Sequence, residues 1–104
     1  MDIKSIIEDS KKVLKNHYRS QFHGLFLYGS VARGQDEKSS DIDLLVLLSK
    51  PFNYFEELRK IIELLYPVQL KSEYLISAKP VAIDEFESGK IHLYRTAKRE
   101  GIAA

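Results

Sequence analysis

The chain has no cysteine and almost no net charge, and each of these features excludes a class of protein or of chemistry. Without cysteine there is no disulfide and no thiolate chemistry, which fits a reducing compartment. Sixteen Lys and Arg against fifteen Asp and Glu give a formal charge of +1, so no strong global field attracts nucleic acid or a membrane surface. No apolar run approaches the roughly 18 residues of a membrane span.

The N-terminal stretch MDIKSIIEDSKK carries acids and lysines where a signal peptide needs an unbroken apolar core, so we expect a cytoplasmic protein. The remaining composition is that of an ordinary globular chain, with 44% hydrophobic and 30% charged residues. A length of 104 residues suits one small domain with a modest core. We therefore expect a single domain over residues 1–104.

Helical and strand signals alternate along the chain. Apolar residues at three- and four-residue steps indicate helices, short apolar runs indicate strands, and Asn53 with Glu56 forms a capping box. Pro67 is expected to end the second helix, and Asp84 to cap a short helical turn. Helices are predicted at 2–19, 53–66, 85–88 and 91–100, and strands at 25–28, 42–48 and 68–77. This order predicts an α/β (α+β) fold, a small mixed β-sheet flanked by helices.

Two aspartates stand at the start of the predicted strand 42–48. Asp41 and Asp43 are separated by one residue, so in an extended strand they point to the same face, with Cα atoms about 6.5 to 7 Å apart. Each alone could cap a strand end or lie at an edge. Together, two ionised carboxylates on a mostly apolar strand cost free energy unless a cation lies between them. Because Mg²⁺ and Mn²⁺ prefer such oxygen ligands, the pair predicts a divalent metal site.

A glycine-serine pair at the end of the preceding strand supplies a candidate phosphate site. Gly29 and Ser30 open an expected helical turn at 31–33, whose backbone N–H groups could hold phosphate oxygens. Arg33 could add the planar donors of its guanidinium. Alone, such a pair after an apolar run is more often only a turn. With the ten-residue spacer and the two aspartates it predicts metal-assisted phosphoryl chemistry.

The combined pattern, Gly29-Ser30, ten residues and Asp41-Ile42-Asp43, resembles the G-S-x10-D-x-D signature of the nucleotidyltransferase fold typified by DNA polymerase beta. The short chain resembles in particular the minimal nucleotidyltransferases of prokaryotes, often encoded as antitoxins beside a HEPN-domain toxin. The resemblance implies two Mg²⁺ (or Mn²⁺) ions on Asp41 and Asp43, and ATP held by Gly29 and Ser30 with help from Arg33. It also implies a protein adenylyltransferase that silences a HEPN partner by moving AMP onto its tyrosine.

Members of this family use a third carboxylate on the next long strand, where Glu73 is the only acid between residues 67 and 81. In an extended strand Glu73 would share a face with Lys71 and Leu75, and it is the candidate third metal ligand and base. A solvated acid paired with Lys71 explains it equally well. This ambiguity supports a second hypothesis, in which the chain keeps the fold but neutralises its partner by binding, with weak or no catalysis.

Other residues give weaker signals. The three histidines have no metal-ligand spacing, and the glycine-rich segment 29–34 is not a Walker loop. The acids Asp84, Glu85 and Glu87 are explained by capping and the helix macrodipole. A basic cluster between residues 90 and 99 indicates a solvated helix face, or contact with an acidic partner or nucleotide. Nucleic-acid binding or polymerisation, a third hypothesis, is disfavoured by the lack of a basic, aromatic-studded stripe.

Overall fold

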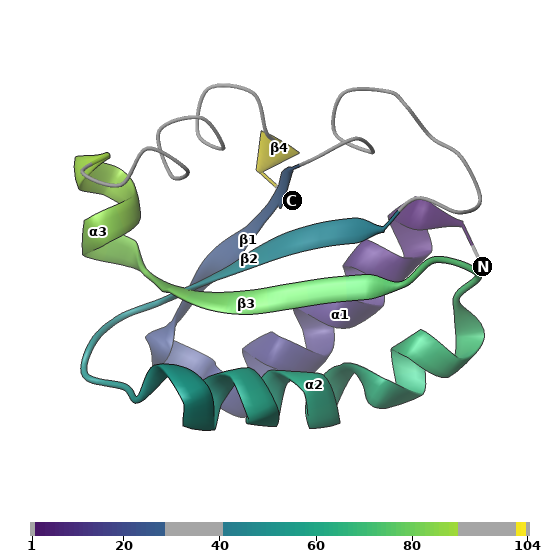
Figure 1. The fold of residues 1–104 in the computed structure, drawn as a ribbon, viewed down its shortest axis with the longest axis horizontal. Helices are drawn as coiled ribbons and strands as arrows, with labels where there is room; N and C mark the ends of the chain where they lie inside the picture. Colours follow the sequence, from purple (N-terminus) through teal and green to yellow (C-terminus); the bar gives the residue numbers. More distant parts are fainter. Residues whose placement is uncertain (1, 29–40, 90–101, 104) are drawn as a thin grey trace.

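The structure of the chain is a computed structural model, and it describes residues 2–28, 41–89 and 102–103 (Figure 1). The elements are α1 (Ile3–Tyr18), η1 (Arg19–Gln21), β1 (Phe22–Tyr28), β2 (Ile42–Leu48), α2 (Tyr54–Lys71), β3 (Ile76–Ala82), α3 (Ile83–Ser88) and β4 (Ile102–Ala103). The predicted α/β fold with a small mixed sheet flanked by helices is confirmed. The helix predicted at 91–100 lies outside the described residues.

The sheet has the order β3-β2-β1-β4, with β2 parallel to β3 and antiparallel to β1. This arrangement brings the end of β1 and the starts of β2 and β3 to one edge of the sheet. Tyr28, the last residue of β1, pairs with Asp43 of β2, which in turn pairs with Ser77 of β3. The predicted aspartate pair therefore lies where three strands meet.

Strand β2 is buried on both faces, which explains its unbroken apolar sequence. Its even-numbered residues, from Ile42 to Leu48, belong to the main core formed with α1 and α2, which cover one face of the sheet (Figure 1). Leu45 and Leu47 point the other way, into a smaller cluster with Val81 and Phe86. Asp41 and Asp43 have the same parity as Leu45, so they belong to the face that α1 and α2 do not cover.

Helix α1 follows its predicted bounds closely. Asp2 caps its start by accepting a hydrogen bond from the Ser5 N–H at 2.8 Å. At its other end the Tyr18 hydroxyl donates to Glu57 of α2 at 2.9 Å, and the two helices are joined there. Burial and this carboxylate raise the pKa of Tyr18. None of the described helices is long and apolar enough to cross a bilayer.

Helix α2 does not stop at Pro67, and that prediction is wrong. Pro67 lies inside the helix, which continues to Lys71. A proline removes one helical hydrogen bond, but Pro67 is on the exposed side, where water can bond the freed carbonyl. Leu65 and Val68 are both buried and hold the helix to the sheet across this point. The strand predicted at 68–77 accordingly begins only at Ile76.

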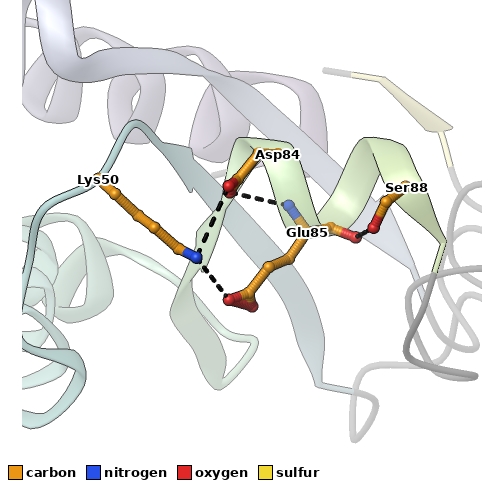
Figure 2. A network of polar contacts seen from close by, with 4 residues as sticks. All are labelled: Lys50, Asp84, Glu85 and Ser88. Atoms are coloured by element: carbon orange, nitrogen blue, oxygen red, sulfur yellow. Dashed lines mark hydrogen bonds and ion pairs between the residues drawn. The ribbon is translucent and has the colours of Figure 1, made fainter.

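Helix α3 is not capped as predicted, and surface ion pairs join its first turn to Lys50. Its N-cap is Ala82, without a side-chain bond, and Asp84 lies in the first turn, where it accepts from the Glu85 N–H at 2.9 Å. Lys50 reaches across from the end of β2, 3.0 Å from Glu85 and 3.6 Å from Asp84 (Figure 2). Gly89 ends the helix in the left-handed region, at φ 64°.

Because both faces of β2 are buried, shortening its core side chains should cause a large loss of stability. Leu44 is fully buried, so Leu44→Ala should lower the free energy of unfolding by about 2 to 5 kcal/mol, measured by urea denaturation. The control, Lys12→Ala on the exposed side of α1, should change it by less than about 0.5 kcal/mol. Equal effects of the two changes would contradict this packing.

Candidate functional site

Asp41 and Asp43 lie at the start of β2, on the sheet face opposite α1 and α2. The Ile42 N–H donates to the Leu75 carbonyl at 2.8 Å, and this bond fixes the strand at its first residue. Asp41, immediately before it, is exposed, while Asp43 is half-buried. The backbone between them is thus held extended, the conformation in which both side chains take the same face.

The two carboxylates oppose each other electrostatically. Burial raises the pKa of Asp43 above its ordinary value of 3.8, and the negative charge of Asp41 raises it further. The positive charge of Lys79 acts in the other direction. The ionised carboxylate of Asp43 therefore destabilises the folded protein, and a cation bound between the two acids would remove this destabilisation.

Lys79 is a residue of this face that the sequence analysis missed. It lies on β3, paired with Leu45, and its Nζ is 5.8 Å from the centroid of the Tyr28 ring, a cation–π contact. Ser77, two residues earlier, stands directly opposite Asp43. The alternation of β3 carried the signal, but it was hidden because that strand was predicted at 68–77, eight residues too early at its start and five at its end.

The predicted phosphate ligands Gly29, Ser30 and Arg33 lie outside the described residues. The structure does describe the residues on either side of this segment, Tyr28 and Asp41. The chain enters the segment from Tyr28 and leaves it at Asp41, and Tyr28 pairs with Asp43. The two residues that flank this segment, Tyr28 and Asp41, therefore lie at the sheet edge that carries the aspartates.

Glu73 is not where the sequence analysis placed it. It lies in a bend between α2 and β3, not on a strand, so the expected shared face with Lys71 and Leu75 is wrong. The reason is the continuation of α2 through Pro67, which leaves only residues 72–75 to connect helix and strand. Glu73 is exposed there, and the structure does not gather it with Asp41 and Asp43.

The donor set suits a hard divalent cation that also binds substrate. Mg²⁺ in proteins is commonly held by one or two carboxylates, with phosphates and water completing its octahedron. Asp41 and Asp43 supply two such groups on one face. In the part of the chain that the structure describes, no three acidic or histidine side chains converge.

Residues 5–102 match the sequence family described as "Polymerase beta, Nucleotidyltransferase". The chain belongs to this family. The sequence prediction of a nucleotidyltransferase is thereby confirmed, and the match spans almost every described element. Nucleotidyltransferases of this family generally act on nucleoside triphosphates with a divalent metal, in agreement with an acidic pair beside a candidate phosphate segment.

Relatives in Methanocaldococcus jannaschii resemble the chain over nearly its full length. One, named "Putative protein adenylyltransferase MJ0141", is 34% identical over 95 residues, which are 85% of this chain and 95% of the relative. Another with the same designation, MJ0604, is 32% identical over 103 residues, 97% of this chain and 96% of the relative.

Two solved structures share the fold. A Sulfolobus solfataricus protein whose provisional name is nucleotidyltransferase aligns with a TM-score of 0.57 at 15% identity, covering 96% of this chain and 79% of its own. A structure described as "the toxin-antitoxin with AMP-PNP" contains a chain that aligns with a TM-score of 0.55 at 19% identity, covering 92% and 70%. At these identities the likeness concerns the fold alone.

The raised pKa of Asp43 predicts that a neutral replacement stabilises the metal-free protein. Below pH 3.8 the carboxyl is protonated in folded and unfolded chains alike and imposes no cost. As the pH rises through the raised folded-state pKa, the cost grows to its full size. Asp43→Asn should therefore raise the melting temperature at neutral pH in chelator, and the gain should shrink as the pH is lowered.

The control for this measurement is Asp84→Asn. Asp84 is exposed and paired with Lys50, so its neutralisation should give no gain in melting temperature at any pH. A destabilised Asp43→Asn variant at neutral pH, or a gain that is the same at low and neutral pH, would show that Asp43 carries no electrostatic cost.

Proposed function

We propose that this nucleotidyltransferase moves AMP from ATP onto a hydroxyl group of a partner protein. The proposal rests on the pair Asp41 and Asp43, which lie on one face of the sheet. They lie at the edge where β1 ends, and Gly29 and Ser30 follow β1 in the sequence. Membership of the nucleotidyltransferase family supports the reaction type. The designation of the archaeal relatives as protein adenylyltransferases supports adenylate as the group and protein as the acceptor.

In this reaction the acceptor oxygen bonds to the α-phosphorus of ATP, the bond from that phosphorus to the bridging oxygen breaks, and pyrophosphate leaves. The hydroxyl proton passes to a base or to water. Asp41 and Asp43 would hold two Mg²⁺ or Mn²⁺ ions, which supply neutralisation of the phosphate charge. Gly29, Ser30 and Arg33 would orient the triphosphate through backbone and guanidinium donors.

The proposed acceptor is a tyrosine of a HEPN-domain toxin, with the chain acting as its antitoxin in the cytoplasm. Support comes from the fold shared with a chain of the structure described as the toxin-antitoxin with AMP-PNP, an ATP analogue. The toxin itself would then complete the acceptor side of the site.

One observation favours a second candidate function, inhibition of the partner by binding without efficient catalysis. On β3 the positions that share a face with Asp43 carry Ser77 and Lys79, not an acid. A general base is then missing from that strand, and the role of Glu73 as third carboxylate stays a prediction. Glu73→Gln tests that role: loss of transfer would establish it, and full activity would remove it.

The experiment that tests the proposal uses the purified chain, the protein encoded in the neighbouring reading frame, Mg²⁺ and labelled ATP. Label on the α-phosphorus should appear on the partner, whereas label on the γ-phosphorus should not, because pyrophosphate departs. Asp41→Ala and Asp43→Ala should each reduce labelling by at least about a thousandfold. The matched control Asp84→Ala, an exposed acid on α3, should leave the rate unchanged.

The outcomes separate the candidates. Partner labelling that depends on both aspartates supports adenylylation. Full neutralisation of the partner by the two alanine variants, without label, would favour inhibition by binding. Label recovered on RNA instead would point to the polymerising activity of the third hypothesis.

A further inference from the structure

Lys79 places a positive charge on the sheet face that carries the two aspartates. It lies on β3 beside Leu45 of β2, and Leu45 has the same parity along β2 as Asp41 and Asp43. Residues that pair across neighbouring strands take the same face of a sheet, as Leu47 and its β3 partner do further along in the smaller core cluster. The half-buried side chain of Lys79 therefore leaves β3 on the aspartate side.

The Lys79 side chain crosses β2 and ends beside β1. Strand β2 lies between β3 and β1 in the sheet (Figure 1), yet the Lys79 Nζ is 5.8 Å from the centroid of the Tyr28 ring on β1. Tyr28 is the cross-strand partner of Asp43, so the ammonium is directed back toward the edge where β2 begins. There its positive charge opposes the rise that burial and Asp41 cause in the pKa of Asp43.

The Lys79 ammonium forms no ion pair with any acid that the structure describes. Lys50 and Lys60, in contrast, are each paired with an acid at the surface. A lysine ammonium carries three hydrogen-bond donors, and a contact with the face of an aromatic ring holds its charge without using an acceptor atom. Lys79 is thus positioned by Tyr28 while its donors remain available to an anionic ligand.

The charges of the site favour a polyanion as that ligand. A divalent ion on Asp41 and Asp43 would repel the nearby ammonium, because two cations would then share one face of the sheet. A phosphate chain relieves this repulsion, since it has several oxygens and can bind the metal ion and the ammonium at the same time. On the basis of the proposed function, we propose that Lys79 is a substrate-binding residue whose ammonium donates to a phosphate oxygen of the nucleoside triphosphate.

This role accounts for the chemistry of β3. The strand, Ile76–Ala82, contains no acid, and Lys79 stands on it where a carboxylate could have faced the aspartate pair. A protonated ammonium neither ligates a metal ion nor accepts the proton of an acceptor hydroxyl. Strand β3 therefore contributes a phosphate donor in place of a base, and the acceptor proton leaves by another route.

The test measures the binding of ATP and of tripolyphosphate to the purified full chain by isothermal titration calorimetry, with Mg²⁺ and without an acceptor protein. Lys79→Met removes the charge and keeps a flexible side chain, so it should weaken the binding of both ligands about tenfold or more. Lys79→Arg keeps the charge and should stay within about fivefold of the unmodified chain. The matched control Lys12→Met, on the exposed side of α1, should change neither affinity.

Two further measurements separate phosphate binding from a structural role. Lys79→Gln, which keeps a polar side chain, should weaken both ligands as Lys79→Met does, so the result does not depend on the folding of one variant. The affinity for Mn²⁺ without nucleotide, followed by electron paramagnetic resonance, should not fall in either variant, because the ammonium repels the metal ion. A fall in Mn²⁺ affinity would overturn the inference by showing that Lys79 shapes the aspartate pair.

The remaining outcomes distinguish this inference from the proposed function. Unchanged ATP binding in Lys79→Met and Lys79→Gln would overturn the inference alone. Weaker binding of ATP with unchanged binding of tripolyphosphate would also overturn it, because Lys79 would then contact the nucleoside. An unmodified chain that binds no ATP would contradict both, whereas ATP binding that depends on Lys79, without transfer to any partner, would support the inference and contradict the proposed function.

Discussion

The repulsion between Asp41 and Asp43, enforced by a strand that is buried along its length, is the interaction on which the functional interpretation depends. A surface loop could relieve such repulsion by moving its side chains apart. Strand β2 has no such freedom, because Ile42 and Leu44 are locked into the core below and the ladders to β1 and β3 fix its backbone. The fold thus holds two like charges on one face. A cation bound between them would cancel the unfavourable free energy of their repulsion.

The topology separates two surfaces with different chemistry. The parallel pairing of β2 and β3 and the antiparallel return from β1 bring strand ends, and therefore polar groups, to one edge. Helices α1 and α2 cover the opposite face, and the outer flank of α2 carries exposed apolar side chains. The same α2 therefore builds the core with Ile61 and Leu65 and presents Ile62 and Tyr66 outward.

Sequence reasoning succeeded where local pattern and burial agree. The bounds of β2 and the start of α1 follow from apolar periodicity, the start of α2 follows from the Asn53 cap, and the face of Asp43 follows from strand alternation. It failed where tertiary packing overrides a local rule: buried Leu65 and Val68 carry α2 through Pro67. That single error displaced β3, put Glu73 on a strand and concealed Lys79, whose position depends on a register that no local pattern specifies.

The most direct test of the metal-binding pair is a titration of Mn²⁺ into the isotope-labelled chain, followed by paramagnetic broadening of its amide NMR signals. Broadening should be strongest at Asp41, Ile42 and Asp43, extend to Tyr28 and Ser77 on the flanking strands, and disappear in Asp41→Asn combined with Asp43→Asn. Broadening centred on the acids of α3, or unchanged in the double variant, would contradict the assignment of the site.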